Sequence, residues 1–121
     1  GFASPYVGEI NRLAACFLKS RQITTVECVD IGRELGNYGQ GALSPDEVTE
    51  LACRADHADA EALVLSCTDM RSVEVVERIE SLTGKPVITS NQAMMFCLMR
   101  ALRLEQHDNT PGQLFEALKT F

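Results

Sequence analysis

The sequence of 121 residues predicts an α/β fold of three α/β/α layers, in which a parallel sheet is flanked by helices. Segments with apolar residues at helical spacing alternate along the chain with short runs rich in β-branched residues. The connections between these segments are short, as expected of right-handed crossovers between parallel strands. Residues 62–67 are almost continuously apolar, which is typical of a central strand covered by helices on both faces.

The first third of the chain predicts a helix, a strand and a loop. Apolar residues at helical spacing predict a helix from Pro5 to about Arg21, with Ser4 as its N-terminal cap and Pro5 at its first position. Residues 23–31 are rich in β-branched types and predict a strand. The loop expected over residues 32–41 contains four glycines and is either a lid over a small polar ligand or a plain surface loop.

One helix is predicted before the central strand in the sequence and another after it. Ser44 and Glu47 have the spacing of a capping box, and Pro45 stands in the first turn. Residues 73–82 predict the second helix, which Gly84 is expected to end. The buried face of the helix that begins after Ser44 is expected to carry Val48, Leu51, Ala52 and Ala55.

The last third of the chain predicts one strand and two helices. Residues 86–89 predict the strand, and residues 91–103 predict a major helix that follows it. Residues 105–112 are a polar connector, and residues 113–121 predict a short amphipathic helix.

The composition excludes several function classes. Seventeen acidic residues against eleven basic ones give a net charge of -6, which opposes any broad electrostatic grip on nucleic acid or an anionic membrane. The longest apolar run, residues 93–99, is far too short to span a bilayer. We therefore expect neither nucleic acid nor a membrane among the partners.

The cysteines indicate a reduced protein. There are five, an odd number, and no two of them form a C-x-x-C pair, which argues against a zinc site, a redox dithiol or a disulfide framework. We expect a cytoplasmic location and no metal. Cys16, Cys28, Cys53 and Cys97 fall inside predicted helices and a strand, where cysteine usually acts as a small apolar filler of the core.

Cys67 is the strongest candidate for chemistry because it ends the predicted central strand. Ligands of parallel sheets bind at the carboxyl ends of strands, and a helix N-terminus beside a cysteine can lower the thiol pKa from about 8.5 to about 7 or below. Such a thiol can act as a nucleophile or a proton carrier; the alternative is a buried cysteine without a role. A cysteine phosphatase loop is excluded because it needs an arginine where the chain has Val73. A cysteine–histidine hydrolase needs His57 or His107 beside the thiol, but both are expected on the surface.

Three blocks of the sequence resemble a known family. In order and spacing they resemble the second half of the maleate isomerase and arylmalonate decarboxylase branch of the aspartate/glutamate racemase superfamily. The resemblance covers nearly the whole chain. The blocks are Ser4-Pro5-Tyr6 with Glu9-Ile10-Asn11, the run Leu65-Ser66-Cys67-Thr68-Asp69-Met70-Arg71, and Gly84-Lys85-Pro86-Val87 with Ser90-Asn91-Gln92-Ala93.

The resemblance implies an enzyme of two similar flavodoxin-like lobes, each with a four-stranded parallel sheet, and an active site in the cleft between them. Residues 1–104 correspond to the second lobe. Residues 105–121 correspond to a connector and a short helix that return to the first lobe. The missing N-terminal lobe is therefore an expected partner, and the face that it leaves open could promote a homo-oligomer.

The resemblance also implies roles for individual residues. Cys67 corresponds to the catalytic cysteine of the second lobe, which faces a cysteine of the first lobe across a small carboxylate substrate. Tyr6 then contributes a hydroxyl that contacts the substrate, and Asn37 contributes a loop amide to the carboxylate.

Four further residues are implied in substrate binding. Ser66 and Thr68, with their backbone N–H groups, are expected to cradle the anion. Ser90 and Asn91 are expected to shape the floor of the cleft. No cofactor and no metal are implied.

The implied function is the isomerisation or racemisation of a small carboxylate, such as maleate or an amino or dicarboxylic acid. One thiolate removes the α proton while the opposite thiol returns one, or one cysteine adds to a double bond while the other handles the proton. A single lobe is expected to be inactive because both groups are required. The alternatives are an arylmalonate-type decarboxylase, an accessory protein of ectoine utilisation and, from another class, a non-catalytic flavodoxin-like binding module.

Overall fold

A computed structural model describes residues 1–105 and 110–120 and contains a sheet of four parallel strands in the order β2-β1-β3-β4. The α/β prediction is confirmed. The strands are β1 (Phe2–Ala3), β2 (Cys28–Val29), β3 (Leu63–Leu65) and β4 (Val87–Thr89). Three of them lie within segments expected to be strands, but they are shorter, and only two residues of the segment 23–31 pair in the sheet.

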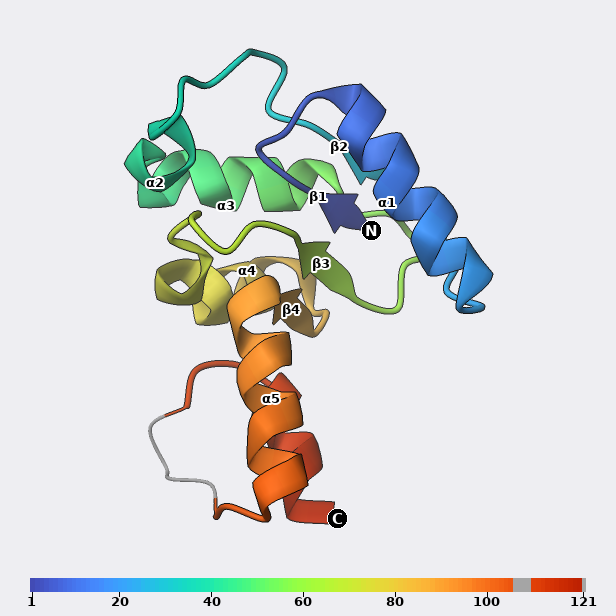
Figure 1. The fold of residues 1–121 in the computed structure, drawn as a ribbon, viewed down its shortest axis with the longest axis vertical. Coiled ribbons are helices and arrows are strands. Elements are labelled where there is room, and N and C mark those ends of the chain that lie inside the picture. The colour runs from blue at the N-terminus through green and yellow to red at the C-terminus, as the bar shows by residue number, and fades with distance from the viewer. Residues whose placement is uncertain (106–109, 121) are drawn as a thin grey trace.

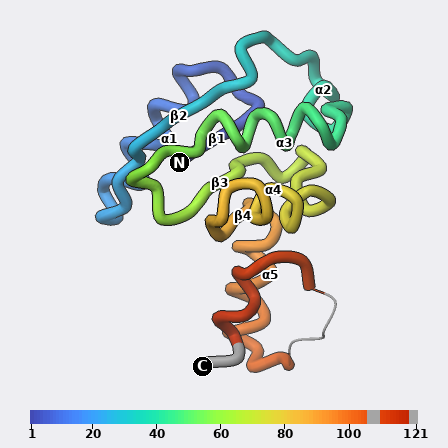
Figure 2. The backbone as a smooth tube through the Cα atoms, turned by 180° about the vertical axis from the view of Figure 1, so that it is seen from behind, coloured from blue at the N-terminus to red at the C-terminus, as the bar shows by residue number. Residues whose placement is uncertain are grey.

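Helices cover both faces of the sheet, as the prediction of three layers requires. Figures 1 and 2 show the first and last helices, α1 (Gly8–Ser20) and α5 (Ser90–Leu102), on one face. The helices α3 (Pro45–Arg54) and α4 (Val76–Thr83) lie on the other. The 3-10 helix η1 (Ser72–Val75) leads directly into α4.

The hydrophobic core lies on one side of the sheet, between the strands and the α3–α4 layer. In β3, Leu63 and Leu65 are buried, whereas Val64, which points to the opposite face, is only half-buried. The described core cluster draws on α3, α4, η1 and the sheet, and no residue of α1 or α5 belongs to it. Large apolar side chains on and beside those two helices are exposed instead: Val7, Ile10, Leu13, Phe17, Met94, Met95, Leu98 and Leu102.

The start of α3 is the capping box that the sequence predicts. The Ser44 hydroxyl accepts a hydrogen bond from the Glu47 N–H at 3.2 Å, and the Glu47 carboxylate accepts one from the Ser44 N–H at 2.9 Å. Donation to this carboxylate from the Ser44 N–H, the Arg33 guanidinium and the Ser44 hydroxyl lowers the pKa of Glu47 to about 2. The expected buried face is confirmed, and Gly84 ends α4 with a φ of 69° in the left-handed region that favours glycine.

The start of the first helix is wrong in the prediction. The helix α1 begins at Gly8, and its N-cap residue is Val7, so neither Ser4 nor Pro5 belongs to it. Both residues lie instead in a buried turn between β1 and α1. The segment 32–41, expected to be a loop throughout, ends in a short helix, α2 (Gly39–Ala42).

The C-terminal segment packs against α5, which extends away from the sheet in Figure 1. The expected amphipathic helix is a 3-10 helix, η2 (Leu114–Thr120). The Phe115 side chain is buried, and its ring centroid lies 6.3 Å from that of Phe96 on α5. Gln92 of α5 donates a hydrogen bond to the Pro111 carbonyl at 2.8 Å, which ties the approach to η2 to the same helix.

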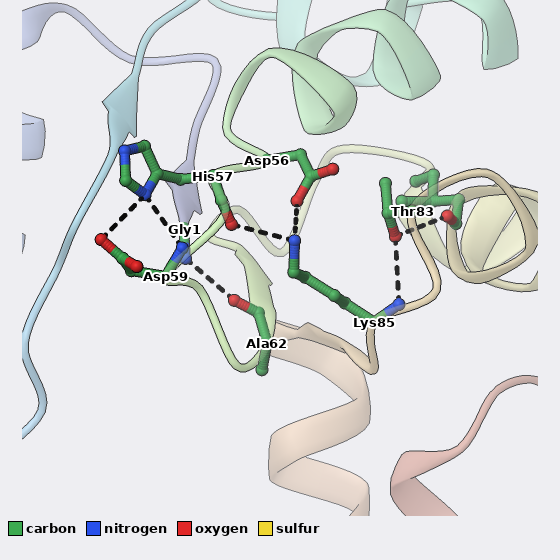
Figure 3. Close-up of polar contacts among 8 residues, drawn as sticks. Gly1, Asp56, His57, Asp59, Ala62, Thr83 and Lys85 are labelled. Atoms are coloured by element: carbon green, nitrogen blue, oxygen red, sulfur yellow. Dashed lines mark hydrogen bonds and ion pairs between the residues drawn. The ribbon is translucent and has the colours of Figure 1, made fainter.

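Polar contacts hold the loops together at the amino ends of β1, β3 and β4 (Figure 3). The Lys85 ammonium forms an ion pair with Asp56 and donates to the His57 carbonyl at 2.9 Å. The Gly1 amine donates to the Ala62 carbonyl at 2.9 Å. These contacts fix the loops at the amino ends of the strands. They leave the carboxyl ends of the strands, called the carboxyl edge below, free of this network.

The one-sided core makes a prediction about stability. Replacement of Leu51, which is 1% exposed on α3, by alanine should lower the free energy of unfolding by about 2–5 kcal/mol because it leaves a cavity in the core. Replacement of Leu82, which is 63% exposed on α4, should cost less than about 0.5 kcal/mol. Urea denaturation measures both values, and equal losses would show that the core is misplaced.

Candidate active site

Cys67 lies two residues beyond the carboxyl end of the central strand β3. The Ser66 N–H still donates to the Ala3 carbonyl of β1 at 2.9 Å, so the chain leaves the sheet at Cys67. The cysteine is 3% exposed and packs against the hydrophobic core. It is thus held at the edge of a parallel sheet where ligands usually bind.

The Tyr6 hydroxyl donates a hydrogen bond to the Cys67 sulfur at 3.2 Å, across 61 positions of sequence. Tyr6 follows β1, and β1 and β3 are neighbouring parallel strands in which Ala3 pairs with Leu65. Their carboxyl ends therefore deliver the two side chains to the same point. This pair is the centre of the candidate active site.

The tyrosine is a proton donor rather than a base at neutral pH. Its hydrogen bond to Cys67 raises the pKa of Tyr6 to about 12, and burial and the negative charges of Cys67 and Asp69 act in the same direction. A phenol with this pKa stays protonated in the physiological range. Its O–H group is therefore available to the sulfur or to an anion that reaches this edge.

The loop after Cys67 is bonded to α5 and lies close to α2. The Asn91 side-chain amide, on the first turn of α5, donates to the Thr68 carbonyl at 2.9 Å. From the other side, α2 lies so close that a Cβ on Gly41 would stand 3.4 Å from the Asp69 carbonyl oxygen. The loop is thus anchored to α5 by a hydrogen bond and lies close to α2.

The predicted binding residues do not all converge on the Tyr6–Cys67 pair. Asn91 reaches the neighbouring loop, and Ser90 is half-buried at the start of α5. Thr68 is exposed beside the cysteine, and Asn37 is exposed in the segment before α2.

One detail of the expected anion cradle is wrong. The backbone N–H of Ser66 is already bonded to Ala3 within the sheet, so it cannot bind an anion, and only the hydroxyl of this residue remains available.

A shallow hollow of about 240 Å³ opens beside Tyr6. Arg33, Leu35 and Gln40 also line it, and the sequence patterns did not single out any of these three. A larger hollow of about 410 Å³ lies at the opposite, amino edge of the sheet, where Asp59 and Glu61 contribute to its lining. Of the Tyr6–Cys67 pair, Tyr6 lines the smaller hollow and Cys67 does not, so this hollow adjoins the candidate site rather than containing the sulfur.

The described histidine lies away from Cys67. His57 lies at the amino edge, where its ring accepts a hydrogen bond from the Asp59 N–H at 3.1 Å (Figure 3), so it is not the partner that a cysteine–histidine hydrolase needs. His107 falls outside the described residues. Within residues 1–105 and 110–120, no cluster of three metal-binding side chains occurs, and no helix is long and apolar enough to cross a membrane.

The remaining cysteines are not the core fillers that the sequence predicts. Cys16, Cys28 and Cys97 are exposed, and Cys53 is partly exposed. For Cys16 and Cys97 the reason is the one-sided core, because α1 and α5 contribute nothing to it, and Cys28 lies on the edge strand β2. Cys53 lies on α3 but is not one of the residues that this helix buries. Cys67 is the buried thiol of the five.

Exposed apolar side chains also lie on segments that begin at the carboxyl ends of the strands. These segments are the start of α1, the segment before α2, η1 and the first turns of α5. Each of these side chains is between 46% and 86% exposed. Together they leave a large apolar surface in water. They are Val7, Ile10, Tyr38, Val73 and Met94.

Comparison with known proteins places these features in a family. A family model described as arylmalonate decarboxylase matches residues 1–115. A maleate isomerase of Pseudomonas putida is 34% identical over 105 residues, which are 84% of this chain and 41% of that protein. A maleate isomerase of Alcaligenes faecalis is 23% identical over 117 residues, which are 96% of this chain and 46% of that protein.

A solved structure shares the fold. The maleate cis-trans isomerase of Nocardia farcinica, in a cysteine-to-serine variant with a covalently bound succinylcysteine intermediate, matches with a TM-score of 0.84 and 21% identity. The match covers 99% of this chain and 48% of that one. The chain thus spans about half the length of the relatives that it matches.

The bond between Tyr6 and Cys67 predicts an unusual titration. Replacement of Tyr38 by phenylalanine leaves Tyr6 as the single tyrosine of the chain, whose phenolate absorbance should then rise only near pH 12. Because the folded pKa lies above the ordinary value of 10.0, the contribution of this bond to stability is complete below pH 10 and is lost as the pH rises through about 12.

Rapid pH jumps followed by absorbance measure the midpoint before the protein unfolds, and far-UV circular dichroism verifies that it is still folded. Adding Cys67→Ala should lower the midpoint, since it removes the largest cause of the shift. A midpoint near 10 in the folded protein with Cys67 intact would contradict the geometry.

Proposed function

Because this chain belongs to the arylmalonate decarboxylase family, we propose that it forms one half of a cofactor-independent enzyme that acts on a small carboxylate through a cysteine. The observation that carries the proposal is the Tyr6–Cys67 pair, with a hydroxyl 3.2 Å from a sulfur at the carboxyl edge of the sheet. A sulfur nucleophile or base beside a hydroxyl that keeps its proton suits reactions in which charge develops next to a carboxylate.

Isomerisation of maleate is the reaction that we favour, because two of the relatives that cover most of this chain are maleate isomerases. In this reaction one cysteine thiolate adds to the double bond while a second cysteine gives a proton to the adjacent carbon, which yields a succinyl adduct. After rotation about the new single bond, the second cysteine takes the proton back as the carbon–sulfur bond breaks, and the trans isomer leaves. Cys67 takes one of these two roles.

Decarboxylation of an arylmalonate is the second candidate, and the description of the matching family model favours it. Loss of carbon dioxide leaves the bonding electron pair on the α carbon as an enediolate, and the Cys67 thiol then protonates that carbon. The residue that faces Cys67 from the other half distinguishes the two reactions. A cysteine there supports isomerisation or racemisation, and a glycine supports decarboxylation.

We place the substrate carboxylate between the Tyr6 hydroxyl and the loop after Cys67. The Tyr6 O–H, the Thr68 hydroxyl and N–H and the Ser66 hydroxyl are the proposed donors, and Asn37 contributes its amide from the segment before α2. Each donor aimed at the developing charge contributes about 3 kcal/mol in enzymes where this has been measured. Ser90 and Asn91 close the floor of the site, where Asn91 already holds the Thr68 carbonyl.

The other half of the enzyme completes the site. The chain spans less than half of the Pseudomonas and Alcaligenes isomerases, and the carboxyl edge of its sheet exposes apolar side chains that a second lobe can cover. Residues 105–121 are proposed to lead back toward that lobe. We place the enzyme in the cytoplasm and expect that this half alone can self-associate through its open face.

The full-length protein tests the proposal with three substrates: maleate, an amino acid such as aspartate, and an arylmalonate. Replacement of Cys67 by serine should reduce turnover of the accepted substrate by about 10²–10⁴-fold, because it removes a catalytic thiol. The 121-residue chain alone should show no turnover. Proton nuclear magnetic resonance detects fumarate, the decarboxylated acid and α-proton exchange in deuterium oxide.

Cys97→Ser is the matched control, since Cys97 is exposed on α5 and takes no part in the proposed site. It should keep the activity of the unmodified enzyme. Full activity of the Cys67→Ser variant would instead support a binding module without chemistry.

A further inference from the structure

A buried polar network lies directly beneath Tyr6, between β1, β2 and α1. The Ser4 hydroxyl donates to the side-chain oxygen of Asn11, and the Asn11 amide nitrogen donates to the Val29 carbonyl at 2.9 Å. The same carbonyl accepts the Ser4 N–H at 3.1 Å. The Tyr6 N–H donates to the Ser4 oxygen at 3.1 Å, which connects the network to the tyrosine.

Asn11 is an unexpected residue to bury. In the fully described helix α1 it is the one buried residue, at 3% exposed, while the apolar side chains Ile10 and Leu13 on either side of it face outward. Burial of an amide costs free energy that its hydrogen bonds only offset, so an apolar side chain would serve packing equally well or better. The arrangement therefore suggests a role other than packing.

The network determines where the Tyr6 backbone lies. Ser4 is fully buried, and its N–H donates to the Val29 carbonyl of β2. Its side-chain oxygen accepts the N–H of Tyr6, two positions further along the chain, which is the turn that a serine side chain forms. The intervening Pro5 fixes one further backbone angle. From this turn the Tyr6 ring has two torsion angles with which to reach Cys67, so a displaced turn displaces the hydroxyl.

We propose that Ser4 and Asn11 are positioning residues that hold the Tyr6 hydroxyl on the Cys67 sulfur. The inference rests on the proposed function only in taking Cys67 as the reactive thiol, and it can be tested without a substrate. Asn11 of α1 bonds both to Ser4 in the turn and to β2, so it fixes the position of Ser4. Ser4 in turn fixes the Tyr6 backbone through the hydrogen bond from the Tyr6 N–H. Neither side chain needs to touch the substrate.

The test is a double-mutant cycle that uses the pH profile of Cys67 alkylation. Iodoacetamide labelling at a series of pH values, read by mass spectrometry of the Cys67 peptide, gives the alkylation rate at each pH. Because Tyr6→Phe removes the hydrogen bond donated to the sulfur, the rate at a fixed pH on the rising part of the profile should fall about fivefold. Ser4→Ala and Asn11→Leu should move this rate in the same direction.

The decisive comparison is made in the Tyr6→Phe background. If Ser4 and Asn11 act through the tyrosine, their substitutions should have no further effect there. Ser4→Thr, which keeps the oxygen, should retain the unmodified profile. Thr49→Val is the matched control, because it removes a hydrogen bond of a different buried side chain, from Thr49 to the Pro45 carbonyl of α3 at 2.8 Å, and should leave the profile unchanged.

Three results would overturn the inference. They are an unchanged profile in Tyr6→Phe, an unchanged profile in Ser4→Ala and Asn11→Leu, and an effect of these substitutions that persists without the Tyr6 hydroxyl. Circular dichroism shows whether Asn11→Leu folds; should it not, Ser4→Ala tests the network by itself. Loss of the proposed function alone, with no turnover of any substrate, leaves these alkylation results intact, so the two failures are distinguishable.

Discussion

The parallel pairing of β1 with β3 is the constraint on which the candidate site depends. Each strand contributes very few residues, yet the register of Ala3 with Leu65 brings together two loops that are far apart in sequence. Tyr6 follows one strand and Cys67 the other, so a hydroxyl and a sulfur meet without any direct connection between them. A slip of one residue in this pairing would turn one side chain to the other face of the sheet.

Helices cover both faces of the sheet, but the hydrophobic core lies on one face only. The layer of α3 and α4 supplies the core, whereas α1 and α5 present apolar side chains to solvent. The same imbalance explains the exposed cysteines and the half-buried side chain of Val64. It also fits a chain that corresponds to about half of its relatives, because a surface that another lobe covers need not be polar.

Local signals in the sequence predicted the elements that depend on local interactions. The capping box at Ser44 and the terminal glycine at Gly84 were correct because each acts within one turn of helix. Ser4 was misassigned because a serine before a proline is an equally good cap, and its real partner, Asn11, is identified only once β2 lies alongside. The Tyr6–Cys67 contact is also long-range, and the family resemblance, rather than periodicity or spacing, pointed to Tyr6.

The network beneath Tyr6 has a consequence for the order of folding. All its members lie within residues 4–29, whereas the thiol that Tyr6 contacts comes from the loop after β3, 61 positions away. Closing the shorter loops costs less chain entropy, so α1, β1 and β2 can associate while β3 is still unstructured. In that order of events, the tyrosine would be in place before the second half of the sheet forms, and Cys67 would meet a hydroxyl whose position the earlier step has determined.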